Sequence, residues 1–216
     1  ILIGGTLGKA RIAGALLGDV AVMGINAKGE SIGQLQIDGS AMSIDIKLLG
    51  GMKQFKAVGW DDGSMDAAYV NSLNLIRSRT WPYTGDLLDV DITLTGQDGK
   101  GVSLKSLRVF GRAQNVSLAM PGDAYSLRAA CWENATIQAN AIKTLRSDGD
   151  FNGMYAGLTL GAMTIQGVNW TDGGVNADYV RKFRMSGDVT GAYLDLTGQD
   201  GKGVSLKSLR VLGRAQ

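Results

Sequence analysis

A short pattern of apolar and polar positions recurs along the whole chain. Its first and fourth residues are apolar, its sixth is apolar or small, and Gly often closes it, as in "LKSLRVFG" from Leu104 and "VRKFRMSG" from Val180. Copies begin at Leu7, Ile32, Met52, Val70, Leu104, Ala124, Ile142, Ala162, Val180 and Leu206. Each copy is partly alternating, which is typical of a β-strand with one buried face, and none is long enough for a capped helix.

The spacing of these segments predicts how the strands are arranged. Most copies begin 18 to 26 residues apart, and one interval of 34 residues contains a long loop. A strand at this period, with two or three further short strands and Gly turns between copies, predicts an all-β parallel β-helix (β-solenoid) of about ten coils, roughly 45–50 Å long. The fourth positions are then expected to form one buried column: Leu35, Phe55, Leu73, Leu107, Leu127, Leu145, Ile165, Phe183 and Leu209.

The chain also repeats itself at a longer distance. Residues 94–114, "LTGQDGKGVSLKSLRVFGRAQ", recur as residues 196–216 with a single difference, Phe110 against Leu212. A more diverged match pairs "VGWDDGSMDAAYV", ending at Val70, with "VNWTDGGVNADYV", ending at Val180. These matches predict one continuous solenoid over residues 1–216, built of two modules at about 1–114 and 115–216.

Units such as "IKTLRSDGDFNG" and "VRKFRMSGDVTG" make the chain similar to a known class of repeat proteins. It resembles the large bacterial surface proteins built from right-handed parallel β-helix repeats, the adhesin and surface-filament type. The resemblance implies a right-handed solenoid and an extracellular or cell-surface location. Proteins of this kind include adhesins, secreted passenger domains and surface filaments, and the same fold also hosts polysaccharide lyases.

Composition narrows the possible functions. The 32 Gly residues indicate many tight turns, and the absence of His removes the commonest general base and the usual zinc ligand. The net charge of +2 gives no overall attraction to nucleic acid, and no apolar run is long enough for a membrane helix. The single Cys131 lies in the apolar run "AACW" and is expected to be buried and inert. We therefore expect no cofactor, no metal and no nucleic-acid partner.

The fifth position of the strand pattern is mostly cationic. Its ten residues include seven basic and no acidic side chains. The basic members, here called the cationic ladder, are Arg11, Lys56, Arg108, Arg128, Arg146, Arg184 and Arg210. If the coils stack in register, these side chains line one outer face about 4.8 Å apart.

Acidic residues concentrate in turns, for example Asp38, Asp98 and Asp148. Three interpretations of this segregation stay open. The ladder is a solvated face with local Asp pairing, a surface for lateral self-association, or a surface that binds an anionic polysaccharide.

Other candidate sites are weaker. Trp81 and Tyr83 stand in the long loop after Val70, where they could stack on sugar rings or fold back over the coil. The "TGQDGKG" segments lack the ligand pattern of a calcium or phosphate loop and are interpreted as turns. Asp89 and Asp91 are the only hint of a carboxylate site, so we expect no enzyme.

The function expected from these observations is structural. The chain is predicted to be a repeat segment of an extracellular or cell-surface filament or a large adhesin, which works by coil stacking and lateral association. The alternative is a carbohydrate-binding or polysaccharide-cleaving β-helix. Neither end shows a capping segment, so we expect stacking to continue at both ends, covalently or between copies.

Overall fold

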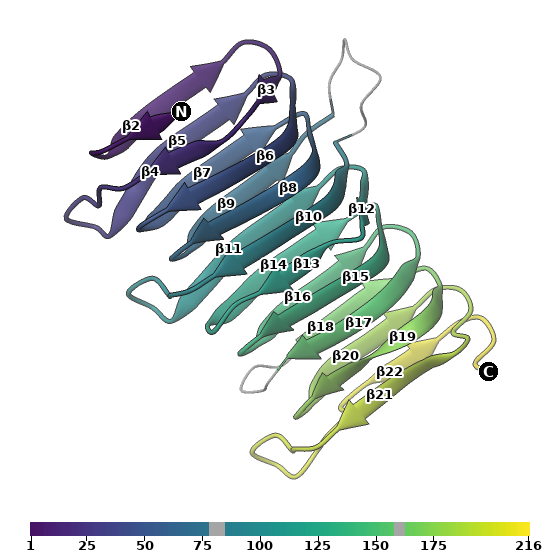
Figure 1. Cartoon of the computed structure of the whole chain (residues 1–216). Helices are drawn as coiled ribbons and strands as arrows, with labels where there is room; N and C mark the ends of the chain where they lie inside the picture. The colour runs from purple at the N-terminus through teal and green to yellow at the C-terminus, as the bar shows by residue number, and fades with distance from the viewer. Residues whose placement is uncertain (78–84, 158–162) are drawn as a thin grey trace.

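The fold was taken from a computed structural model that describes residues 1–77, 85–157 and 163–216. In these ranges the chain is all-β and contains no helix, so no helix in them could cross a membrane. The chain passes back and forth between two parallel sheets, and each new strand lies beside the previous strand of the same sheet (Figure 1). This stacking of parallel strands is compatible with a β-solenoid.

The two sheets are named here sheet 1 and sheet 2. Sheet 1 contains β1 (Leu2–Ile3), β3 (Leu16–Leu17), β4 (Val20–Val22), β6 (Ser40–Leu48), β8 (Gly59–Ala67), β10 (Leu87–Leu94), β12 (Arg112–Gln114), β13 (Ser117–Ala119), β15 (Cys131–Ala139), β17 (Phe151–Gly157), β19 (Trp170–Ala177) and β21 (Ala192–Leu196). Sheet 2 contains β2 (Leu7–Ile12), β5 (Glu30–Ile37), β7 (Gly51–Ala57), β9 (Val70–Leu75), β11 (Val102–Val109), β14 (Asp123–Ala129), β16 (Ile142–Ser147), β18 (Met163–Gly167), β20 (Val180–Met185) and β22 (Leu209–Val211).

The strands of sheet 2 carry the recurring apolar pattern in register. The fourth-position residues face one another from Leu35 in β5 to Leu209 in β22. The predicted buried column is confirmed from Leu35 to Phe183, where every member is at most 3% exposed. Leu209 is the exception, because β22 is the last strand of the sheet and no further strand covers it.

Sheet 1 has a bend that the sequence analysis missed. Residues in the left-handed region recur near the middle of successive strands, at Ser43, Asp62, Asp89, Asn115 and Asn134. At Asn115 the bend separates β12 from β13, and Gly18, with φ 94°, likewise lies between β3 and β4, whereas at the other four residues the strand continues through the bend. The expectation of two or three further strands between copies is therefore wrong for most of the stack, because a left-handed residue turns one strand without ending it. Asn and Asp suit this conformation since their short side chains bond locally.

Large aromatic side chains fill the start of the sheet 1 strands. Trp60, Trp132 and Trp170 are at most 1% exposed, and Trp132, Phe151 and Trp170 face one another across the strands. The Phe151 and Trp170 rings stack with centroids 5.1 Å apart. Each indole N–H has a backbone acceptor: Trp60 donates to Asp62 O at 3.1 Å and Trp170 to Asp172 O at 2.7 Å. The equivalent positions of Trp60 and Trp170 thus serve packing.

Both sheets run without a break through the predicted module boundary at residue 114. β11 pairs with β14 in sheet 2, and β10 pairs with both β12 and β13 in sheet 1. Residues 1 and 216 lie at opposite ends of the stack (Figure 1). At the two ends large apolar side chains are exposed: Ile1, Leu2, Leu17, Met23, Ile25, Tyr193, Leu209 and Leu212.

Candidate functional site

The cationic ladder lies in register on the outer face of sheet 2. Arg108 faces Arg128, which faces Arg146, and farther along Arg184 faces Arg210. Gln36, Asn74 and Gln166 fill the uncharged steps between the others. Each ladder residue is exposed or half-buried, whereas the residue that precedes it is buried, except for the partly buried Ala10 and the exposed Leu209 at the two ends of the sheet. The strand pairing therefore brings together the residues that the sequence pattern singled out.

Acidic residues at the neighbouring corner neutralise part of the ladder. Asp148 accepts hydrogen bonds from Arg128 at 2.7 Å and from Arg146 at 3.0 Å. Partial burial of Asp148 acts to raise its pKa, but the bonds and charges of the two arginines outweigh it, so the pKa lies below its ordinary value.

The same arrangement recurs near the start of the stack. Gln36 and Arg11 each donate a hydrogen bond of 2.7 Å to Asp38, and these bonds hold the pKa of Asp38 below its ordinary value. The sequence analysis placed Asp38 and Asp148 in turns, and the structure shows that these turns hold them within hydrogen-bonding distance of ladder residues.

The other ladder residues form no ion pair in the ranges that the structure describes, although the charge of Lys56 helps to lower the pKa of Asp38. The Arg108 guanidinium lies over the ring of Phe110, 4.2 Å from its centre. Lys56, Arg184 and Arg210 form no ion pair with a described residue. Among the described residues the ladder is therefore a mixture of ion-paired and unpaired cations and not a uniform positive stripe.

A row of uncharged polar side chains runs beside the ladder on the same face. These residues stand two positions before the ladder and pair in register from strand to strand: Gln34, Gln54, Ser72, Ser106, Ser126, Thr144 and Thr164. The pattern was visible in the sequence but was not used. Hydroxyl and amide groups next to cations can hydrogen-bond the hydroxyl and acidic groups of a sugar chain.

The "TGQDGKG" segments form turns built around an aspartate. Asp98 Oδ1 accepts hydrogen bonds from Lys100 N at 2.8 Å and Val102 N at 3.0 Å. In the second copy Asp200 Oδ1 accepts from Lys202 N and Val204 N at the same distances. The two backbone bonds place the pKa of Asp200 below its ordinary value.

A third copy of this turn lies near the start of the chain, at residues 26–30. Asn26 Oδ1 accepts from Lys28 N at 2.8 Å and from Glu30 N at 3.0 Å. The fourth residue of each turn is a Gly with positive φ: 76° at Gly29, 81° at Gly101 and 78° at Gly203. Sequence comparison missed this copy because only a short signal is shared: Asp or Asn, any residue, then Lys-Gly.

Two of the three turns stand beside cationic grooves on the sheet 2 side. The groove beside residues 98–102 has a volume of about 550 Å³ and is lined by Lys53, Gln54, Asn71, Ser72, Asp98, Lys100, Lys105 and Ser106. The groove beside residues 200–204 has a volume of about 170 Å³ and is lined by Tyr179, Arg181, Asp200 and Lys207. Lys105 and Lys207 are equivalent residues of the repeated block.

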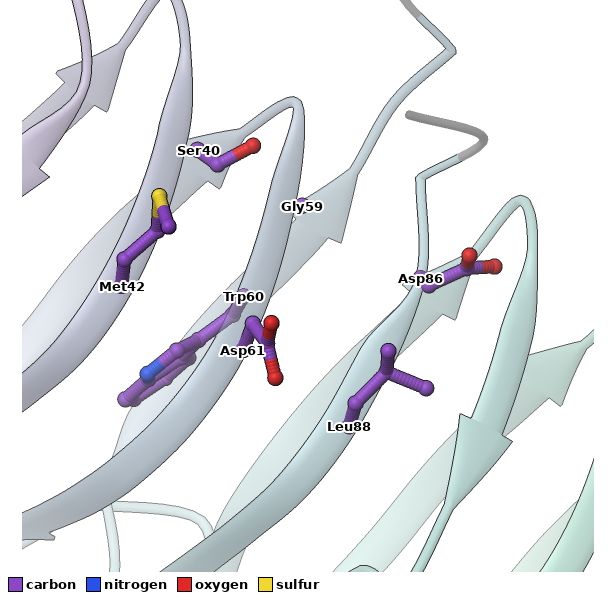
Figure 2. Close-up of a pocket in the computed structure, with 7 residues that line it drawn as sticks. All are labelled: Ser40, Met42, Gly59, Trp60, Asp61, Asp86 and Leu88. Carbon is purple, nitrogen blue, oxygen red and sulfur yellow. The ribbon is translucent and has the colours of Figure 1, made fainter. Parts of the chain in front are cut away.

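The pocket in Figure 2 lies at the base of the long loop after Val70. It has a volume of about 50 Å³ and is lined by Ser40, Met42, Gly59, Trp60, Asp61, Asp86 and Leu88. Ser40 Oγ is buried and lacks a hydrogen-bond partner within the described part of the chain. The space holds a few water molecules but is well below the size of a substrate site.

The remaining sequence candidates are not brought together into a site. Asp89 is one of the left-handed residues and accepts a 2.7 Å hydrogen bond from Asn115 Nδ2, which links two strands of sheet 1. Cys131 is partly buried, and burial together with Glu133 raises its pKa to about 12, so the thiol stays protonated at neutral pH. Trp81 and Tyr83 lie outside the described residues.

Comparison with protein-family models, with curated proteins and with solved structures finds no match.

Proposed function

We propose that this chain is a structural segment of an extracellular or cell-surface filament or a large adhesin, a right-handed β-solenoid of about ten coils. Its proposed activity is stacking, end to end with copies of itself and side by side through the cationic ladder. The observation that carries the proposal is the continuity of two parallel sheets through the described residues, with one apolar column buried from Leu35 to Phe183. Uncovered parallel strands present unpaired backbone groups that favour addition of a further strand.

The repeated block indicates what fits on the uncovered C-terminal end. Within the chain, the turn at residues 98–102 is covered by the next coil, where Gly122 N donates to Ser103 Oγ at 3.0 Å and Asp123 N to Gly101 O at 3.0 Å. The equivalent Ser205 Oγ donates to Gly198 O at 2.7 Å but accepts no hydrogen bond from a described residue. The C-terminal end thus displays a surface that is occupied in the first copy.

The covering coil needs a Gly at this corner. A Cβ at Gly122 would lie 2.6 Å from Ser103 Oγ, and a Cβ at Gly50, which covers the first turn, would lie 2.5 Å from Gly29 O. Both glycines stand two residues before a strand pattern, which begins at Ala124 and Met52 respectively.

Gly5 has the same place, two residues before the pattern that starts at Leu7. A Cβ there would meet nothing within 4 Å in the chain. The N-terminal coil of a second copy therefore has the residue that the C-terminal end requires. Such a head-to-tail contact does not close on itself, and repetition gives a fibre.

The test is the assembly of Gly5→Ala. The added methyl group has space in the single chain, so folding stays intact, but it would collide with Ser205 of the next copy. Sedimentation velocity over a concentration series should show assembly of the wild type and a loss of at least tenfold in the association constant of Gly5→Ala. Gly4→Ala is the matched control, because the covering coils have Leu49 and Pro121 at that position.

Assembly that is equal in all three proteins, or a wild type that stays monomeric at millimolar concentration, would overturn end-to-end stacking. Lateral contacts are separable by salt. Raising the ionic strength from ~10 mM to ~0.5 M should weaken contacts through the ladder and leave end-to-end stacking in place. Replacement of Lys56, Arg108 and Arg184 by Gln removes unpaired ladder charges and should have the same effect as salt.

A further inference from the structure

The three turns at residues 26–30, 98–102 and 200–204 can be compared residue by residue. All three have the same hydrogen bonds and a Lys as third residue: Lys28, Lys100 and Lys202. Seven residues after the first residue of each turn stand Gly33, Lys105 and Lys207 respectively. The two cationic grooves described above accompany the second and third turns. In each of them a basic residue outside the turn, Lys105 or Lys207, lines the groove together with the aspartate of the turn.

The groove beside residues 98–102 is a site for acidic groups. Lys53, Lys100 and Lys105 supply three cations, and each is exposed. Hydroxyl and amide side chains lie among them: Gln54, Asn71, Ser72 and Ser106. The one acidic lining residue, Asp98, uses its Oδ1 to accept two backbone hydrogen bonds of its own turn. Cations combined with neutral donors match a sugar ring that carries a carboxylate or sulfate.

The second groove repeats this chemistry farther along the same face. Arg181 and Lys207 supply the cations, and Tyr179 adds an aromatic side chain suited to contact with a sugar ring. The strand order from β11 to β22 passes β14, β16, β18 and β20, which at ~4.8 Å per step places the grooves about 24 Å apart along the stack. The polar row and the ladder lie on the sheet between them.

We propose that the two grooves bind one linear anionic polysaccharide, which lies along the outer face of sheet 2. This function is separate from end-to-end stacking, because it uses the side of the stack and needs no second copy. It also gives the repeated block 94–114 and 196–216 a shared role, since each copy supplies a turn and a groove lysine. Single-stranded nucleic acid fits less well, because it requires successive aromatic stacking platforms and the first groove has no aromatic lining residue.

The test measures binding to the whole chain carrying Gly5→Ala, so that end-to-end assembly does not contribute, and sedimentation velocity in the same buffer checks that lateral contacts do not. The probes are polygalacturonate for carboxylates, heparin for sulfates, dextran as a neutral chain and a single-stranded DNA oligonucleotide, each followed by isothermal titration calorimetry at low salt. The double variant Lys105→Gln, Lys207→Gln should lower the affinity for at least one of the two anionic polysaccharides about tenfold. Lys28→Gln removes one charge from the first turn, which has Gly33 where the other two turns have Lys105 and Lys207, and should change affinity less than twofold.

The pattern of results decides the proposal. Preference for polygalacturonate or for heparin identifies the acidic group and supports it. An equal loss in Lys28→Gln would show general charge attraction and overturn the groove assignment. Equal binding of dextran, tighter binding of DNA than of both anionic polysaccharides, or no binding at millimolar protein would also overturn it. Lys53→Gln is a second variant for the first groove and should weaken binding in the same direction.

Discussion

Residues 94–114 and 196–216 have almost the same sequence but different structures. In the first copy β11 spans eight residues, and Leu107 is 0% exposed. In the second copy β22 spans three residues, and the equivalent Leu209 is 59% exposed. The first copy is covered by β14, whereas the second is the last strand of sheet 2.

The difference shows how this fold obtains its order. Both copies have the same apolar pattern and the same turn, so local preference is equal in the two places. In the second copy no further strand of sheet 2 lies beside β22, and β22 is shortened to three residues, although β2, the other edge strand of the sheet, keeps six. Stability in a stack of this kind is shared between neighbouring coils.

The largest expected difference between the copies is in the cost of removing the column leucine. Leu107→Ala leaves a cavity between covered strands and should lower the free energy of unfolding by roughly 2–5 kcal/mol. Leu209→Ala removes a side chain that is mostly exposed and should cost less than about 1 kcal/mol. Denaturant unfolding measures both values. Hydrogen exchange should show that the damage from Leu107→Ala stays in adjacent coils, and equal costs at the two sites would contradict the comparison.

An effect of intermediate size on hydrogen-exchange protection is expected when residues 196–216 are followed by the coil that follows residues 94–114. A second copy of residues 115–139 added after Gln216 should cover Leu209 and lengthen β22. Burial of a Leu side chain contributes about 1.5–3 kcal/mol, so protection of the Leu209 and Arg210 amides should rise about 10–100-fold in hydrogen exchange. The control is the same tail with Asp in place of the residue copied from Leu127. An unpaired carboxylate is too costly to bury in the apolar column, so this tail should not cover Leu209. A similar gain with both tails would mean that chain length, and not coverage, orders the end.

The smallest effect concerns the ladder beyond the first copy, where Asp148 pairs with Arg128 and Arg146. The folded-state pKa of Asp148 is lowered, so its contribution is present above the ordinary pKa near 4 and is lost as pH falls through the folded value. Because the carboxylate is 41% exposed, solvent screening limits the contribution to below about 1 kcal/mol. Asp148→Asn should flatten the stability profile below pH ~4 in thermal unfolding, and an unchanged profile would show that the pairs contribute nothing measurable.

The sequence predicted the parts of the fold that follow from apolar spacing. The buried column from Leu35 to Phe183 and the register of the cationic ladder both follow from a pattern that recurs once per coil. The bend of sheet 1 could not be predicted in the same way. Ser43, Asp62 and Asn115 are chemically diverse and sit among other polar residues, so their shared left-handed conformation is hidden in an ordinary surface pattern.

For the candidate site, the sequence predicted the row of cations along sheet 2 but neither the ion pairs nor the grooves. The residue types at the fifth pattern position predicted the ladder. The ion pairs of Asp38 and Asp148 with it depend on the conformation of the turn that follows each strand. The first groove depends on residues from three strands and a turn, including Lys53 and Lys105, which are 52 positions apart. Their proximity is a consequence of stacking, which a search for local motifs does not detect.

The location of residues 1 and 216 at opposite ends of the stack has a mechanical consequence. A pull on these two points acts along the direction in which hydrogen bonds join successive strands, so the strands separate one after another and not all together. Leu107, Leu127 and Leu145 mark coils of 20 and 18 residues. Each coil that opens replaces a ~5 Å step by an extended segment of roughly 60–70 Å. Under tension the molecule is therefore expected to lengthen in repeated stages of similar size, as an extensible tether that absorbs load coil by coil.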